Sequence, residues 1–444
     1  MSSVAAAPRP KTGVSLLLLA VVTSVVAYAL QGLGLLEEVP EDLVPYAVAF
    51  LAAAVGGWVG VRVMARGADP ALYPVAVFLS GLGLAMLFRI MTAQGDPSVA
   101  QAQAVWLVIG LAVFTACLAL IRDIRRLDAL TYTIGLAGLV LLLLPIVPGL
   151  GVVENGAKLW VKLPGVPQFQ PAEFGRILIV IFLASFLAQR RELLSAGVGK
   201  WGLPRAKDLG PLLLAWGASL AVLFLERDLG ASLLLFGVFV VMVWVATGRW
   251  SYLVIGLVLF AAGAFVGWLA FDHVQVRVAA WLHALDPAFV NGDGYQLAQG
   301  WFGMATGGMS GTGLGQGAFL PMGGRSLIPY VGSDFILAAF GEELGMLGVS
   351  ALLLGYLVLV GRGLRIAIER HDAFERLLAV GLTTLVGLQV FVIAGGVLRL
   401  IPLTGVPLPL VSYGGTSRVA TFIILALLIR TSAGPWRRRR KAAT

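Results

Sequence analysis

One aspartate stands where a charged side chain is costly. Asp334 lies within Ile-Pro-Tyr-Val-Gly-Ser-Asp-Phe-Ile-Leu-Ala-Ala-Phe-Gly-Glu-Glu-Leu-Gly at 328–345, where a long polar connection meets an apolar run. Charged groups at membrane depth are rare because they must pair, reach water or meet a polar ligand. Asp334 is therefore the first residue for which the sequence demands a role.

Other charged residues are expected at the same face of the membrane. Both signs occur among them, with eight cations and eight carboxylates, so internal pairing is possible. Arg and Lys side chains around a shared cavity would also suit the phosphate of a lipid head group. The set comprises Arg89, Glu154, Lys158, Lys162, Glu173, Arg176, Glu226, Arg227, Asp228, Asp272, Arg277, Asp334, Glu342, Glu343, Arg399 and Arg418.

Two short charged segments have structural explanations as well as functional ones. Pro171 favours the first turn of a helix, and Glu173 and Arg176 stand three residues apart, so they can pair on one helix face. Pairing and ligand binding are equally open for them. The charged segment at 225–230 interrupts an apolar run, and a hairpin tip is sufficient to explain it.

Two glutamates follow Asp334 along the expected helix. With about 100° per residue, Glu342 would lie about 80° from Asp334, and Glu343 would lie roughly opposite. We therefore expect Glu342 alone to share the face of Asp334, and Glu343 to pair with a neighbouring helix. The 3 histidines lack metal-ligand spacing, which argues against a zinc site.

The composition requires a membrane protein. Hydrophobic residues make up 59% of the 444 residues, charged residues only 12%, and the mean hydropathy is +0.92. Apolar runs of roughly 17–25 residues suit helices that cross a bilayer. We expect an all-α polytopic protein with about twelve transmembrane helices. The expected spans are 14–36, 43–61, 73–88, 102–121, 129–147, 174–188, 210–225, 229–247, 253–271, 335–360, 377–398 and 413–429.

The positions of the basic residues predict the topology. Most of the 32 Lys and Arg residues fall in connections on the side of the N-terminus, so both termini are expected in the cytoplasm. This distribution explains the net charge of +9 without a nucleic-acid partner. The basic tail at 436–444 is expected to bind anionic lipids. The single Cys117 lies in a span, which excludes a disulfide framework. The first apolar run is too long for a signal peptide and is expected to be retained.

Long connections on the non-cytoplasmic side are the expected places for function. They cover 148–171 and 272–333, and the second is rich in glycine. The segment 401–415 places several prolines and glycines between two spans, and such backbone is tolerated at membrane depth where protein or a wet cavity surrounds it. We expect it to line the same cavity as Asp334.

Several motifs together resemble one family. They are Asn-Gly-Ala-Lys-Leu-Trp at 155–160, Phe-Gln-Pro-Ala-Glu at 169–173, Gly-Tyr-Gln-Leu-Ala-Gln at 294–299, Ser-Asp-Phe-Ile at 333–336, Gly-Glu-Glu-Leu-Gly at 341–345, Leu-Ile-Pro-Leu-Thr-Gly at 400–405 and Leu-Val-Ser-Tyr-Gly-Gly at 410–415. In this order they resemble the shape, elongation, division and sporulation (SEDS) family, which includes RodA and FtsW. The resemblance runs from about Tyr73 to Ile429.

The resemblance implies an enzyme. SEDS proteins polymerise lipid II into peptidoglycan strands and release undecaprenyl pyrophosphate. They work with a class B penicillin-binding transpeptidase and other membrane proteins of the elongation or division complex. The essential aspartate of the family falls on Asp334, as general base or in metal-assisted activation of the acceptor hydroxyl. A divalent cation, Mg²⁺ or Mn²⁺, is left open, and the sequence shows no metal ligands of its own. The expected substrate-binding residues are Lys158, Glu173, Arg176, Asp228, Arg277, Gln296, Glu342, Arg399 and Ser412.

The resemblance also implies an organisation and a location. Residues 1–70 would be two extra N-terminal helices, 71–435 a ten-helix catalytic core and 436–444 the tail. The protein would lie in a bacterial cytoplasmic membrane with its active site on the extracellular face. The extra helices resemble actinobacterial RodA-type members, although a division role like that of FtsW stays open. Alternatives are a lipid II flippase and a scaffold for the transpeptidase.

Overall fold

The chain is a bundle of membrane-length helices. The computed structural model describes residues 10–94, 97–154, 157–162, 168–195, 217, 229–318, 328 and 330–434. In this part, 11 helices are long and apolar enough to cross a membrane. The predicted all-α polytopic fold is thus confirmed. The span predicted at 210–225 lies outside the described residues, apart from residue 217.

Two compact units make up the protein, and each is assembled from separate stretches of the chain. Unit 1 contains Met1–Asp123, Gly300–Gly363 and Leu408–Thr444, and unit 2 contains Ile124–Gln299 and Leu364–Pro407. Two helices, α11 (Tyr295–Gly307) and α12 (Ile336–Glu369), pass from one unit into the other.

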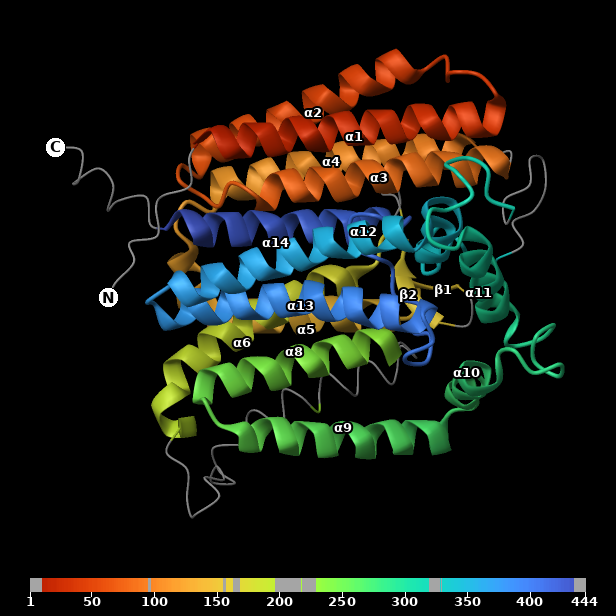
Figure 1. Cartoon of the computed structure of the whole chain (residues 1–444). Helices are drawn as coiled ribbons and strands as arrows, with labels where there is room; N and C mark the ends of the chain where they lie inside the picture. The colour runs from red at the N-terminus through yellow and green to blue at the C-terminus, as the bar shows by residue number, and fades with distance from the viewer. Residues whose placement is uncertain are drawn as a thin grey trace, which may run out of the picture. The chain divides into compact units, whose positions relative to one another are not determined.

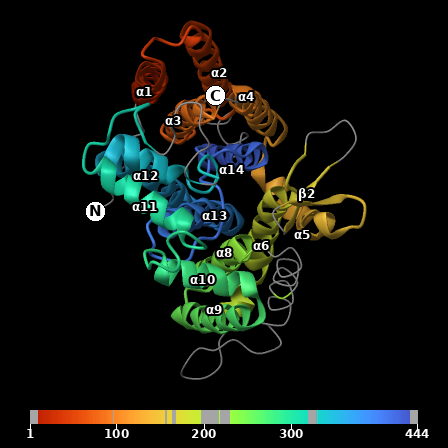
Figure 2. The same cartoon turned by 90° about the vertical axis from the view of Figure 1, so that its right-hand side faces the viewer.

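Unit 1 is built around two buried helices. Its other helices are α1 (Pro10–Leu36), α2 (Leu43–Met64) and α4 (Pro97–Leu120), and the buried pair is α3 (Leu72–Ala93) and α14 (Gly415–Ala433). Burial reaches 72% of the span in α3 and 83% in α14, but only 28–39% in α1, α2 and α4. Helix α1 packs along α3, and α4 packs along α14 (Figures 1 and 2). The two N-terminal helices are thus part of unit 1 and cover α3.

Unit 2 places α6 and α13 at its centre. Its elements are η1 (Ile124–Arg126), η2 (Asp128–Leu130), α5 (Thr131–Leu143), η3 (Leu144–Ile146), β1 (Gly151–Glu154), β2 (Ala157–Val161), α6 (Pro171–Ser195), α8 (Leu229–Thr247), α9 (Trp250–Ala270), α10 (Asp272–His283) and α13 (Ala373–Val397). Burial is 78% in both α6 and α13, which pack against each other and against α8 (Figure 1). Helix α9 is only 11% buried, so most of its apolar surface is left for lipid.

The long connections contain secondary structure that the sequence patterns did not indicate. In the connection 148–171, β1 and β2 pair antiparallel, from Gly151 opposite Val161 to Glu154 opposite Ala157. The connection 272–333 contains α10 and α11, for which no helix was predicted. Both helices are short and amphipathic, so they lack the apolar length by which the spans were found.

Candidate active site

Asp334 lies in a turn before α12. The turn covers 331–334, hereafter the Asp334 turn, and α12 begins at Ile336. The Asp334 side chain is half-buried, and its Oδ1 lies 3.1 Å from the hydroxyl oxygen of Ser333. The expectation that Glu342 shares a helix face with Asp334 was therefore wrong, because the rotation of about 100° per residue applies only inside a helix.

Contacts from three segments fix the Asp334 turn. The amide of Tyr413 donates to the carbonyl of Gly332 over 2.7 Å. Phe335 is fully buried, and its ring lies so close to Gly300 of α11 that a Cβ there would be 2.1 Å from it. A Cβ at Gly332 would lie 3.4 Å from Leu87 Cδ2 of α3. The turn is thus held between α3, α11 and the segment before α14, which is a suitable base for a reacting group.

The proline- and glycine-rich segment at 401–415 was expected to line the same cavity as Asp334. Its residue Tyr413 contacts the Asp334 turn, and a cavity shared with Asp334 stays a prediction. Ser412 is buried, and its hydroxyl accepts a hydrogen bond of 2.9 Å from the Leu408 amide. That bond closes a turn in which Leu410 has φ +69°. Ser412 therefore has a structural task here, and its binding of substrate remains a prediction.

A buried ion pair joins α3 to α12, the helix that follows the Asp334 turn. Arg89 Nε of α3 donates to Glu343 Oε1 of α12 over 3.1 Å, with both side chains nearly inaccessible to solvent. The prediction that Glu343 pairs with a neighbouring helix is confirmed. Gln31 of α1 donates to the other oxygen of this carboxylate over 2.9 Å. Gln31 was not predicted as a partner of Glu343, although an amide side chain within an apolar run indicates a hydrogen-bond partner on another helix.

The neighbouring Glu342 binds backbone. It is buried, and its Oε1 accepts a hydrogen bond of 2.7 Å from the Ala318 amide. Because this carboxylate oxygen holds a loop amide, Glu342 contributes to the structure of the loop at 311–318. Its predicted role in substrate binding is left as a prediction.

Arg418 is a buried cation of a different kind. The side chain belongs to the first turn of α14 and is 1% exposed. None of its three guanidinium nitrogens has a hydrogen-bond partner within the part of the chain that the structure describes. A buried charge without a partner is costly, so this arginine is a strained feature of unit 1.

In unit 2, the start of α6 carries the predicted Glu173–Arg176 pair. Arg176 Nη2 lies 2.7 Å from Glu173 Oε1, and both side chains are more than nine-tenths buried. Arg176 Nε also donates to the Ala172 carbonyl over 3.3 Å. Of the two possibilities left open for these residues, the structure shows the pairing, and substrate binding by Glu173 and Arg176 stays a prediction. Lys158 lies on β2 and is exposed.

Two further predicted cations of unit 2 bind backbone carbonyls. Arg277 of α10 donates from Nη1 to the Thr404 carbonyl over 2.9 Å. Arg399, with φ +55°, donates to the carbonyls of Trp281 and Leu282, each over 3.0 Å. These bonds attach α10 to the chain after α13.

Gln296 and Asp228 are the two remaining residues predicted to bind substrate. Gln296 is half-buried on α11 and has a polar contact. Asp228 lies outside the described residues, as do Glu226 and Arg227.

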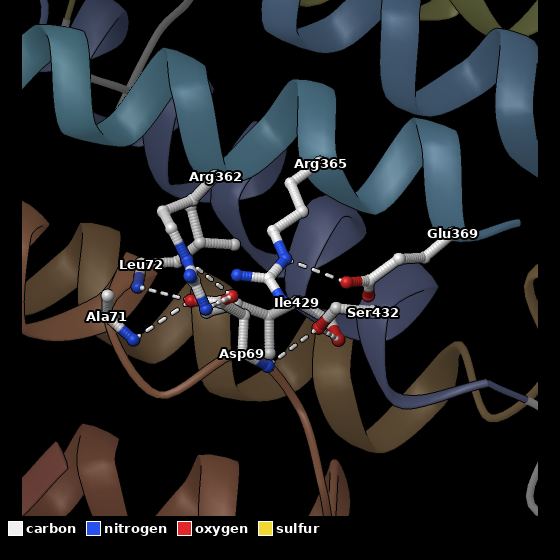
Figure 3. A network of polar contacts seen from close by, with 8 residues as sticks. All are labelled: Asp69, Ala71, Leu72, Arg362, Arg365, Glu369, Ile429 and Ser432. Atoms are coloured by element: carbon white, nitrogen blue, oxygen red, sulfur yellow. Dashed lines mark hydrogen bonds and ion pairs between the residues drawn. The ribbon is translucent and has the colours of Figure 1, made fainter. Parts of the chain in front are cut away.

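A second polar network ties the helix ends of unit 1 that lie far from the Asp334 turn (Figure 3). Arg362 of α12 binds the Asp69 carboxylate, and its Nε–Oδ2 distance is 2.7 Å. The same carboxylate accepts from the amides of Ala71 and Leu72, at the start of α3. The Asp69 amide donates to the Ser432 hydroxyl of α14 over 3.0 Å. Asp69 thus binds the amides at the start of α3 and joins this helix to α12 and α14.

The described residues do not by themselves form a cation site. Among them, no three His, Cys, Asp or Glu side chains gather as a metal would require. The Ser333 hydroxyl lies next to the Asp334 carboxylate. The Mg²⁺ or Mn²⁺ left open by the sequence would therefore need ligands beyond these side chains, such as substrate phosphates and water.

Comparisons with known proteins agree on one family. The family model described as "Cell cycle protein" of FtsW, RodA and SpoVE matches residues 70–434. The chain is similar to peptidoglycan glycosyltransferase RodA of Mycobacterium tuberculosis, with 46% identity over 409 residues, covering 90% of this chain and 85% of the relative.

Solved structures share the fold. One comes from a study of the structural coordination of polymerization and crosslinking by a peptidoglycan synthase complex, with a TM-score of 0.64, 28% identity and coverage of 83% of this chain and 99% of the other. The crystal structure of the rod shape determining protein RodA from Thermus thermophilus has a TM-score of 0.57 and 26% identity, and covers 83% of this chain and 98% of the other.

Proposed function

This chain belongs to the FtsW, RodA and SpoVE family of cell cycle proteins, and from that premise we propose how its residues carry out the family's reaction. It is a multi-pass membrane enzyme, a peptidoglycan glycosyltransferase like its mycobacterial relatives. Its reaction is the polymerisation of lipid II for cell elongation. The RodA-type reading of the sequence is supported by the 46% identity to RodA of M. tuberculosis.

The observation that carries the catalytic proposal is the placement of Asp334. Its carboxylate is half-buried on a turn that contacts from three segments hold in place. A general base must be held within hydrogen-bond reach of the proton that it removes. A half-buried carboxylate on a turn that neighbouring segments hold in place meets this requirement.

The proposed step transfers one proton, forms one bond and breaks one bond. Asp334 accepts the proton of the acceptor sugar hydroxyl, and the hydroxyl oxygen forms a bond to the anomeric carbon of the donor. The bond from that carbon to the pyrophosphate oxygen breaks, and undecaprenyl pyrophosphate leaves with the electron pair. Attack opposite to the leaving group inverts the anomeric centre. Charge on the departing pyrophosphate would be stabilised by the predicted substrate-binding cations, because guanidinium and ammonium groups bind phosphate oxygens strongly.

The location and partners follow from the same premise. We place the protein in the bacterial cytoplasmic membrane with both termini in the cytoplasm and Asp334 at the extracellular face. The basic residues of the connections support this topology. The partner that we propose is a class B penicillin-binding transpeptidase, within an elongation complex. The similar protein from a complex that polymerises and crosslinks peptidoglycan supports such a pairing.

Polymerisation by purified protein tests the catalytic role. The protein, reconstituted with its transpeptidase, would receive purified lipid II, and the glycan polymer would be resolved on a gel. Asp334→Asn should bind lipid II and make no polymer. The matched control is Asp293→Asn, which changes an exposed carboxylate in the turn before α11. Polymer from Asp334→Asn at the level of the control would refute the assignment.

The flippase and scaffold alternatives give different results in related assays. A flippase would move fluorescent lipid II across vesicles, and Asp334→Asn would then change transport without a polymerisation step. A scaffold would leave polymer yield unchanged by substitution of Asp334. Loss of polymer without loss of lipid II binding therefore separates the enzyme from both.

A further inference from the structure

Helix α12 is broken at Gly345. This residue has φ +65° and ψ −168° inside an otherwise helical run, so the carbonyls before the break lose their helical partners. Backbone from the connection after α11 replaces them. The amides of Thr312 and Gly313 donate to the carbonyls of Glu342 and Glu343, each over 3.0 Å. The first segment of α12, which follows the Asp334 turn, is thus joined to this loop.

The loop from 311 to 318, hereafter the clamped loop, is bound to α12 by side chains as well. The Gly315 amide donates to Glu343 Oε2 over 3.0 Å, and the Ala318 amide donates to Glu342 Oε1 over 2.7 Å. Arg89 of α3 donates from Nη2 to the Gly317 carbonyl over 3.1 Å. The clamped loop is therefore held by two carboxylates of α12 and one guanidinium of α3.

The end of α1 lies directly on the clamped loop. A Cβ at Gly34 would lie 1.9 Å from the Leu314 carbonyl oxygen, and a Cβ at Gly315, where φ is +82°, would lie 2.6 Å from the Gln31 carbonyl oxygen. Only residues without a side chain allow the two backbones to approach so closely. The contact therefore depends on a glycine from each side.

Gln31 adds a side-chain bond to this contact. Its Nε2 donates to Glu343 Oε2, the oxygen that also accepts the Gly315 amide. Gln31 and Glu343 are each 1% exposed, so water does not replace a lost bond easily. A hydrogen bond to a buried charge contributes more than one between neutral groups. One amide of α1 thus supports the point where the loop, α3 and α12 meet.

We propose that α1 is a clamp that positions Asp334, with Gln31 and Gly34 as its positioning residues. Helix α1 lies before residue 70, where the family match begins, yet it secures the loop that stabilises the break in α12. Without the clamp, the segment between the Asp334 turn and Gly345 loses one of the supports that limit its tilt at the break. The inference rests on the proposed function, because it assigns the clamp to the reaction at Asp334.

Two variants and one control test the clamp. Gln31→Met removes the donor at nearly equal volume, and Gly34→Val places a side chain against the Leu314 carbonyl. The control Gly56→Val makes the same change on α2, where a Cβ would meet nothing within 4 Å. Hydrogen exchange of the 311–318 amides and the kinetics of lipid II polymerisation are then measured on all three proteins.

We expect both variants to speed exchange of the clamped loop at least about tenfold, because its amides lose protection. We expect kcat to fall about 10- to 100-fold with KM for lipid II nearly unchanged, because a misplaced base loses rate rather than binding. Gly56→Val should change neither. If Gly34→Val does not fold, Gln31→Met decides the question.

Two results would overturn the proposal. Unchanged exchange in 311–318 would show that α1 does not hold the loop. Faster exchange with unchanged kcat would show that the loop is held but does not position Asp334. The proposed function fails in a different way, with no polymer from the unaltered protein. That result would also refute the positioning of Asp334 for this reaction. The hydrogen exchange of 311–318 would still show whether α1 holds the loop.

Discussion

Replacing Arg89 with methionine should destabilise the protein by about 3–5 kcal/mol, the cost of breaking a buried ion pair by removing one partner. Arg89 and Glu343 are 2% and 1% exposed, and their charged atoms lie 3.1 Å apart. After the change, the Glu343 carboxylate keeps Gln31 and the Gly315 amide as donors. Because these bonds offset part of the cost, the loss should lie near the lower end, about 3 kcal/mol.

A second substitution shows whether the charge is the cause. In Arg89→Met/Glu343→Gln, the amide oxygen of the new residue can still accept from Gln31 and Gly315, but the buried charge at position 343 is gone. We expect the double variant to recover at least about 1.5 kcal/mol relative to Arg89→Met, because an unpaired buried charge costs more than a neutral amide.

An exposed pair provides the matched control. Arg365→Met removes the partner of Glu369 one turn along α12, where both side chains are 50% exposed. Such surface pairs contribute about 0–1 kcal/mol. Unfolding in mixed detergent micelles, followed by tryptophan fluorescence, gives all the free energies. If Arg89→Met costs no more than Arg365→Met, the reasoning about the buried pair is wrong.

Three other changes have definite expected outcomes. Arg418→Met should raise the free energy of unfolding by about 1–4 kcal/mol in the same assay, because an apolar group replaces an unpartnered buried charge; a decrease would contradict this. Arg362→Met should lower stability by about 1–3 kcal/mol by leaving Asp69 without its guanidinium, with kcat of the folded enzyme unchanged; a fall in kcat would show that this network reaches the reaction. Gly300→Val should reduce kcat about 100-fold, because its side chain would displace the Phe335 ring beside Asp334; polymerisation at the normal rate would show that this packing does not position the base.

Local patterns were sufficient for the framework of the protein. The spans follow from hydrocarbon thickness, which sets a length that can be read in one dimension. Helix α6 begins at Pro171 and carries the Glu173–Arg176 pair because both depend on neighbours within one turn. Glu343 was expected to need a partner on another helix, since it would otherwise be an uncompensated charge.

The contacts between distant segments could not be read in this way. The sequence does not say that Arg89 is the partner of Glu343, because 254 positions separate them. Gln31 lies in an apolar run that reads as an ordinary span, and the approach of Gly34 to the clamped loop depends on backbone geometry. Asp334 was placed on a helix because the apolar run suggested one, whereas the turn before α12 is set by tertiary contacts.

A single-turnover experiment tests the central claim most directly. Enzyme in excess would be loaded with radiolabelled lipid II in detergent, and the released undecaprenyl pyrophosphate would be measured over time for the unaltered protein and for Asp334→Asn. We predict release of undecaprenyl pyrophosphate from the unaltered protein and essentially none from Asp334→Asn, although both bind the same amount of lipid II. Release from Asp334→Asn at the normal rate would contradict the assignment of Asp334 as the base.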